Sequence, residues 1–206
     1  MSFHLFENDI LFLQRFATIA GHYKGPMDGK WSHAVDEAEQ SLNDEYEKIK
    51  VRLGSFDPRS ETNIATLLPK AQQKCREFMN VAAKLPFQHK ILSGTRTYGE
   101  QNELYAKGRT TKGPIVTHAK GGRSNHNFGI AWDVGIFDHA VYNTGDTHEQ
   151  SLVYTQLAAS IKNSVEGLEW GGDWHSFKDQ PHFQLATGHR DVAEIEQLFE
   201  NGKVFA

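Results

Sequence analysis

Two short segments of this sequence carry side chains that could bind one metal ion together. The first contains His126 and Asp133, and the second contains His182. Two imidazoles and one carboxylate form the mixed nitrogen and oxygen set that holds a catalytic zinc ion when a fourth position is kept for water. Asp179 lies in the second segment and is left over as a base. The sequence therefore predicts an open zinc site with an acid beside it.

The predicted zinc site suits the hydrolysis of a peptide bond. A zinc ion with three protein ligands lowers the pKa of its water to about 7 and polarises a carbonyl oxygen. Asp179 would accept the proton of that water and hand it to the departing amine. Arg96 lies between a predicted strand and a predicted helix, where its charge could balance the negative oxygen of a tetrahedral intermediate. A structural ion pair is the alternative role for Arg96.

The elements that carry these residues must bend. His126 and Asp133 are an odd number of residues apart, so a straight strand would point them to opposite faces. The segment 127–129 can supply a bend, which places His126 on a loop and Asp133 on the strand that follows it. Pro181 excludes a regular helix around Asp179 and His182, because proline lacks an N–H donor and clashes with the preceding turn. A tight turn that leads into a strand is predicted instead.

Composition indicates a globular chain with a real core. Hydrophobic residues make up 38% and charged residues 23% of the 206 residues, with thirteen Phe and four Trp. The formal charge of −4 gives no electrostatic reason to expect nucleic acid or an anionic membrane as a partner. The single cysteine, Cys75, cannot form an internal disulfide, and its apolar helical surroundings predict a buried thiol.

The sequence contains no candidate for a membrane span or a secretory signal. No stretch approaches the ~20 apolar residues that cross a bilayer, and the first residues have neither a basic start nor a long apolar run. We therefore expect synthesis in the cytoplasm without a signal peptide.

Hydrophobic periodicity predicts a mixture of helices and strands. Helices are expected at 8–20, 32–49, 69–82, 100–107, 149–162 and 192–199, and strands at 89–94, 130–137 and 183–185. The lack of strict alternation predicts an α+β fold, with a small mixed or antiparallel sheet flanked by helices. Turn residues at 54–60 predict a boundary between a helical appendage, residues 1–60, and the zinc-binding domain, residues 61–206. Residues 108–122 are expected to form a long surface loop.

Several motifs, in order, resemble the family of zinc D-alanyl-D-alanine carboxypeptidases and L-alanyl-D-glutamate endopeptidases. The central pattern runs from Ser124 through His126, Gly129 and Ala131 to Asp133, and an acid-x-x-His motif ends at His182. Two flanking segments, at 93–101 and 170–174, are similar to the endopeptidase branch in particular. That branch includes phage endolysins and bacterial cell-wall hydrolases. The resemblance covers residues 68–185.

The resemblance implies a role for each candidate residue. His126, Asp133 and His182 match zinc ligands, Asp179 matches the catalytic acid and base, and Arg96 matches the residue that stabilises the oxyanion. Ser124 and Gln101 match positions that line the substrate site, and Trp170 is either a substrate platform or a core residue.

The implied reaction is hydrolysis of the L-Ala to D-Glu bond in the stem peptides of peptidoglycan. Aspartate at position 179 favours this reaction over the dipeptidases of the family, which carry glutamate there. A D-Ala-D-Ala carboxypeptidase or dipeptidase is the alternative within the family. A cell-wall-binding protein without catalytic activity is the alternative outside it.

The N-terminal segments 13–16 and 25–31 resemble part of a small peptidoglycan-binding module. The alternative is a helical hairpin that only extends the core, in which case Tyr23 and Trp31 would be core residues rather than exposed aromatics. The expected partner is the stem peptide, an immunity or inhibitor protein is a candidate second partner, and a monomer is expected. Without a signal peptide, the chain would reach the wall through holin-type release during phage lysis or through a secretion apparatus.

Overall fold

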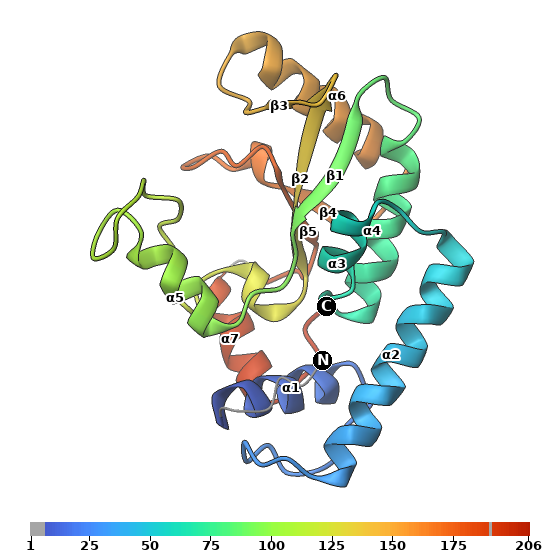
Figure 1. Ribbon diagram of the computed structural model, residues 1–206, viewed down its shortest axis with the longest axis vertical. Coiled ribbons are helices and arrows are strands. Elements are labelled where there is room, and N and C mark those ends of the chain that lie inside the picture. The colour runs from blue at the N-terminus through green and yellow to red at the C-terminus, as the bar shows by residue number, and fades with distance from the viewer. Residues whose placement is uncertain (1–6, 190) are drawn as a thin grey trace. The chain divides into compact units, whose positions relative to one another are not determined.

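The structure is a computed structural model that describes residues 7–189 and 191–206 (Figure 1). Its α-helices are α1 (Glu7–Ile19), α2 (His33–Leu53), α3 (Pro58–Ile64), α4 (Pro69–Ala82), α5 (Tyr98–Ala106), α6 (His148–Lys162) and α7 (Val192–Glu200). Two short 3-10 helices are η1 (Asn125–Phe128) and η2 (Gly171–Asp173). The strands are β1 (Gln88–Ser93), β2 (Ala131–Asp138), β3 (Val141–Asn143), β4 (Leu168–Trp170) and β5 (His182–Leu185). No described helix meets the length and hydropathy that a bilayer span requires.

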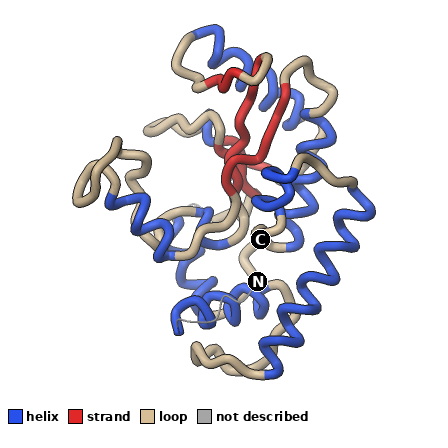
Figure 2. Tube along the Cα trace, in the orientation of Figure 1, coloured by secondary structure: helices blue, strands red, loops and turns tan. Residues whose placement is uncertain are grey.

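The strands form one antiparallel sheet, drawn in red in Figure 2. The order is β1-β2-β5-β4, and β3 pairs with the far end of β2. The predicted α+β class is confirmed. The strands β3 and β4 are three residues each, too short for an alternating pattern to stand out, and sequence analysis does not predict them.

The chain forms two compact units, each made of segments that are not continuous in sequence. The first, which we call the terminal unit, contains described residues up to 47, residues 96–129 and described residues from 187 onward. The second, the sheet unit, contains residues 48–95 and 130–186. The predicted division into residues 1–60 and 61–206 stays a prediction, since contacts alone do not test which segment folds by itself.

One face of the sheet in the sheet unit packs against α4. The Phe78 ring lies 4.8 Å from that of Phe183 and 5.9 Å from that of Trp132, and all three side chains are buried. Side chains alternate along a strand, so the residues that follow Trp132 and precede Phe183 point to the other face. Those residues are Asp133 and His182, and the apolar packing thereby turns both toward the opposite side of the sheet.

The predicted break at residues 54–60 contains a helix, which corrects the sequence analysis. Asp57 accepts a hydrogen bond from the Ser60 N–H, and Pro58 occupies the first turn of α3. Aspartate is a good N-cap and proline fits the first helical position, so two of the residues that suggested a boundary are start signals for a helix. In α6, Leu157 and Ile161 are buried, whereas Leu152 is 52% exposed.

An aromatic cluster forms much of the core of the terminal unit. The Phe199 ring of α7 lies 5.3 Å from that of Phe12 in α1 and 5.4 Å from that of Phe128 in η1. Tyr98 and Phe205 complete the cluster. The first helix therefore shares a core with η1 and α7. Tyr23 is buried as well, whereas Trp31 is partly exposed.

Candidate metal centre

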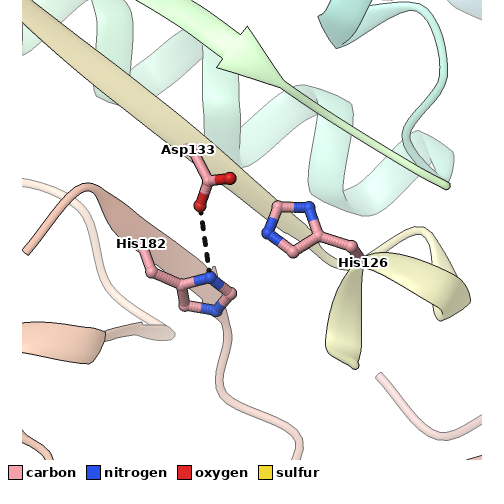
Figure 3. A group of neighbouring side chains, drawn as sticks. All are labelled: His126, Asp133 and His182. Carbon is pink, nitrogen blue, oxygen red and sulfur yellow. Dashed lines mark ion pairs between the residues drawn. The ribbon is translucent and has the colours of Figure 1, made fainter. Parts of the chain in front are cut away.

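Three side chains form a group that could hold a metal ion (Figure 3). His126, Asp133 and His182 each offer one ligand atom, and these atoms all lie within 4.8 Å of one another. Both histidines are buried and Asp133 is partly buried. Among the described residues, no other group of three such side chains is found. The three predicted ligands are therefore brought together, although the first and the last are 56 positions apart in the sequence.

Strand pairing brings Asp133 and His182 side by side. The two residues are direct partners in the antiparallel ladder between β2 and β5, and the side chains of such a pair share a face of the sheet. The Val134 N–H donates to the Pro181 carbonyl oxygen at 2.9 Å, which fixes this register beside the proline turn. Nδ1 of His182 lies 3.4 Å from Oδ1 of Asp133.

A bend before β2 positions His126. The residue lies in η1, and Gly129 then adopts a left-handed conformation with φ of 72° before β2 begins. Glycine reaches this region without the steric cost that a side chain imposes. The predicted bend between His126 and Asp133 is thus confirmed, and Gly129 is the residue that makes it.

Main-chain hydrogen bonds attach Arg96 to the same 3-10 helix. The Arg96 N–H donates to the His126 carbonyl oxygen at 3.0 Å. The Asn127 side chain donates to the Arg96 carbonyl oxygen at 2.9 Å and accepts from the Gly122 N–H at 3.0 Å. Asn127 is fully buried. It therefore fastens the segment after β1 and the segment before η1 to the helix that carries His126.

A tight turn carries Asp179 to the start of β5. The His182 N–H donates to the Asp179 carbonyl oxygen at 3.2 Å, and the Asp179 N–H donates to the Gly171 carbonyl oxygen at 3.1 Å. A side chain at Gly171 would meet the Asp179 backbone oxygen at 2.5 Å. Glycine is therefore required there, and the predicted proline turn is confirmed. The negative charge of Asp179 helps to raise the pKa of His182.

The donor atoms of His182 and Asp133 have the separation expected for two ligands of one tetrahedral metal ion. Two ligand atoms that each lie about 2.0–2.1 Å from a tetrahedral ion are about 3.4 Å apart, which is the observed separation between His182 and Asp133. Burial alone would lower the pKa of His182, but the hydrogen bond and charge of Asp133 raise it above its ordinary value, with smaller contributions from Gln184 and Asp179. The Asp133 carboxylate therefore favours a proton on the His182 ring.

The residues predicted to contact substrate differ in exposure. Ser124 is partly exposed and immediately precedes η1. Gln101 is fully buried, and its side-chain amide donates to the Ala119 carbonyl oxygen at 2.9 Å. Trp170 is also buried and donates from its indole N–H to the Gln180 carbonyl oxygen at 2.8 Å. The substrate-binding role of all three stays a prediction.

Two residues near the candidate site were not assigned such a role from the sequence. Asn127 was considered only as part of a bend, although it lies beside His126. Gln184 lies two residues after His182 in a strand whose other members are apolar. The sequence pattern that could have identified Gln184 is the alternation of polar and apolar residues in β5. This alternation places Gln184 on the same face as His182.

A family model described as D-alanyl-D-alanine carboxypeptidase matches residues 117–185. The match contains His126, Asp133, Asp179 and His182 but not Arg96. The chain is 36% identical over 127 residues to the peptidoglycan L-alanyl-D-glutamate endopeptidase CwlK of Bacillus subtilis strain 168, covering 58% of this chain and 73% of that relative.

A similar solved structure is that of the L-Ala D-Glu endopeptidase ChiX from Serratia marcescens. It matches with a TM-score of 0.46 and 25% sequence identity, over 63% of this chain and 88% of that one. The assignment depends on the sequence relative, of which this chain spans more than two thirds at 36% identity. By that similarity, the chain belongs to peptidase family M15, the D-alanyl-D-alanine carboxypeptidase family.

Proposed function

We propose that this protein is a zinc-dependent peptidoglycan hydrolase that cleaves the L-Ala to D-Glu bond of stem peptides. One observation carries the proposal: His126, Asp133 and His182 converge in a chain that is 36% identical to an L-alanyl-D-glutamate endopeptidase. Family membership alone would also allow a carboxypeptidase. The relative named as an endopeptidase, together with aspartate at position 179, favours cleavage within the stem peptide.

Zinc is the proposed metal because of the donor set. Two imidazoles and one carboxylate are typical of catalytic zinc sites that leave a fourth position open. When bound by these residues, zinc would supply Lewis acidity, which makes water easier to deprotonate and polarises a carbonyl oxygen. The partly buried Asp133 would gain a cation for its carboxylate, which offsets the cost of removing that charge from water.

Asp179 is proposed to move the proton. Its carboxylate would accept a proton from the attacking water and deliver it to the amino group of D-Glu as the peptide bond breaks. Support comes from the turn that joins Asp179 to His182 through a main-chain hydrogen bond of 3.2 Å. The backbone of this turn is also held against Gly171, so Asp179 starts from a fixed position.

Arg96 is proposed to balance the negative charge that develops on the former carbonyl oxygen. Its main chain is bonded to that of His126, which fixes the start of the side chain near a proposed ligand. A preorganised cation stabilises such a charge without a further reorganisation cost. Ser124 is the proposed direct substrate contact. Gln101 and Trp170 are proposed to shape the substrate site from buried positions, through their hydrogen bonds to the Ala119 and Gln180 carbonyl oxygens.

The proposal is tested by digesting purified peptidoglycan and identifying the new termini. Cleavage of the proposed bond produces free amino groups on D-Glu. Release of D-Ala alone would instead identify a carboxypeptidase. A chelator should abolish either activity, and added zinc should restore it.

The Asp179→Asn variant separates catalysis from wall binding. It retains the proposed ligands and should bind peptidoglycan without producing new termini. If the variant retains the full lytic effect of the wild type, the protein acts by binding alone and the proposed function is wrong.

A further inference from the structure

The buried ring of His182 has a hydrogen-bond partner on the side away from Asp133. Nε2 of His182 lies 2.9 Å from Oε1 of Gln184, and both side chains are buried. The two residues are two positions apart in β5 and therefore share a face of the sheet. The other ring nitrogen, Nδ1, lies on the Asp133 side, where the proposed metal would bind.

The Gln184 amide is itself oriented by a carboxylate. Gln184 Nε2 donates to Oε2 of Glu169 at 2.9 Å, and the two residues are direct partners in the ladder between β4 and β5. A carboxylate accepts hydrogen bonds and does not donate them when ionised. If the amide were turned over, its oxygen would face the carboxylate and its NH₂ group would face the ring. Glu169 therefore selects the orientation in which the amide oxygen points at His182.

This arrangement determines which ring nitrogen carries the hydrogen. An amide oxygen can only accept, so Nε2 of His182 must be the donor. The protonated ring also donates from Nδ1 to Asp133, and a neutral ring with its hydrogen on Nε2 carries its lone pair on Nδ1. Nδ1 is the atom 3.4 Å from Asp133. In metal sites, the group that accepts from the non-ligating nitrogen of a histidine fixes both its tautomer and its ring orientation.

We propose that Gln184 and Glu169 are positioning residues that hold His182 as the Nε2–H tautomer, so that Nδ1 is the atom that binds the metal. Gln184 contacts the ring, and Glu169 acts through Gln184. The inference deepens the proposed function and rests on its metal site, because it states how one of the three ligands is prepared. Strand β4, which carries Glu169 but none of the proposed ligands, would thereby help to orient one of them.

The first measurement concerns the metal-free wild-type protein. Long-range ¹H–¹⁵N correlation of the histidine rings at alkaline pH, where imidazoles are neutral, reports the tautomer directly. We expect the Nε2–H form for His182 in the wild type. In the Gln184→Met variant, which keeps the side-chain length but removes the acceptor, we expect a shift toward a mixture of tautomers. A predominant Nδ1–H form in the wild type would overturn the inference without reference to any variant.

The second measurement is the zinc dissociation constant, from competition with a chelating dye. Gln184→Met should weaken zinc binding by roughly ten- to a hundredfold, the usual effect of losing such a partner. The matched control is Gln72→Met in α4, which also removes a buried amide but one that donates to the Ile64 carbonyl oxygen. The control should lose a similar amount of thermal stability, but its zinc affinity should not change.

Glu169 provides a graded test of the indirect role. Glu169→Gln keeps an oxygen that can accept from Gln184 and should retain most of the zinc affinity. Glu169→Met removes that acceptor and should weaken binding, although less than Gln184→Met because position 169 is exposed. If Gln184→Met binds zinc as tightly as the wild type, the inference is wrong.

The outcomes also separate this inference from the proposed function. If the wild type binds no zinc, the proposed metal site fails and the inference fails with it. If zinc binding and the tautomer depend on Gln184 as expected but peptidoglycan yields no D-Glu amino groups, only the proposed cleavage specificity fails.

Discussion

The main-chain N–H of Arg96 donates a hydrogen bond of 3.0 Å to the carbonyl oxygen of His126. The bond joins the segment that follows β1 to the 3-10 helix that carries a proposed metal ligand. Asn127 adds a second connection, from its side-chain amide to the Arg96 carbonyl oxygen. Because both connections use main-chain atoms of Arg96, a change of its side chain should leave the backbone of the site in place.

Arg96→Met should therefore reduce catalysis without loss of metal. Removing one group that stabilises a developing oxyanion typically reduces kcat by about 10²–10³-fold. Peptidoglycan turnover and metal content are measured together, with Arg59→Met, at an exposed position of α3, as the matched control. An Arg96→Met variant with wild-type kcat would assign Arg96 a structural role.

Loss of a ligand and loss of the proton carrier should have different consequences. His126→Ala should reduce both zinc content and activity, because only two proposed ligands remain. Asp179→Asn should keep its zinc, since Asp179 lies outside the proposed ligand group, and should still lose activity. Elemental analysis of dialysed protein together with the product assay distinguishes the two. Zinc bound equally well by His126→Ala would show that the metal site is elsewhere.

The buried His89 of β1 should make stability fall in mild acid. Burial lowers its pKa to about 4, with the Phe87 backbone acting weakly in the opposite direction. An unfolded histidine has a pKa of about 6.5, so between about pH 6.5 and 4 the unfolded chain binds a proton that the folded chain excludes. Stability is therefore full above this range and decreases as the pH falls through it, by up to about 3 kcal/mol.

Urea unfolding at pH 7 and pH 4.5 measures this effect. The His89→Leu variant should lose less stability between the two pH values than the wild type does. His33→Leu is the control, since the side chain of His33 is 85% exposed. Equal pH dependence in His89→Leu and the wild type would contradict the assignment.

The ion pair between the buried Arg76 and the partly buried Glu61 should be costly to break. Arg76 donates to both carboxylate oxygens of Glu61 at 2.9 Å and to the Gly54 carbonyl oxygen at 2.7 Å. Burial raises the pKa of Glu61, but the hydrogen bonds from Arg76 and the Phe56 N–H and the charge of Arg76 together lower it by more. The net pKa of Glu61 therefore lies below its usual value. The stability that the ionised pair provides is lost as the pH falls through this lowered pKa.

Arg76→Met should reduce the free energy of unfolding by about 2–3 kcal/mol, less than for a fully buried pair, because the Glu61 charge that loses its partner is partly exposed. Replacing both residues, as Arg76→Met with Glu61→Leu, should restore part of that loss, since no buried charge is then stranded. Chemical denaturation of the two singles and the double gives the coupling energy. A coupling near zero would mean that the pair contributes nothing specific.

The aromatic cluster of the terminal unit should be sensitive to truncation at Phe199. This fully buried ring contacts Phe12, Tyr98, Phe128 and Phe205. Phe199→Ala should cost about 3–5 kcal/mol, as for other large cavities, whereas Leu198→Ala on the partly exposed neighbour should cost less. Thermal unfolding compares the two. Similar small losses would indicate that α7 is only loosely attached.

The sequence by itself determined the local elements and the chemical types at the site. Helical spacing gave α4 with Pro69 in its first turn, and short apolar runs gave β1, β2 and β5, because the period of buried residues follows from backbone geometry. The residues at 126, 133 and 182 could be predicted as ligands from their types and motifs, and for Asp133 also because an apolar strand rarely buries an unpaired carboxylate. Asp57 and Pro58 belong to residue types that occur both in turns and at helix starts. The sequence analysis therefore predicted a boundary where α3 begins.

Only the tertiary structure decided which residues face one another. Asp133 and His182 are 49 positions apart, and their pairing depends on the register between β2 and β5, which no local pattern encodes. The register between β4 and β5 places Gln184 opposite Glu169, and the Gln184 amide oxygen then faces the His182 ring. Side-chain type is a property of the sequence, but hydrogen bonds between strands form only after long loops have closed. The support of His182 could therefore be read only from the folded chain.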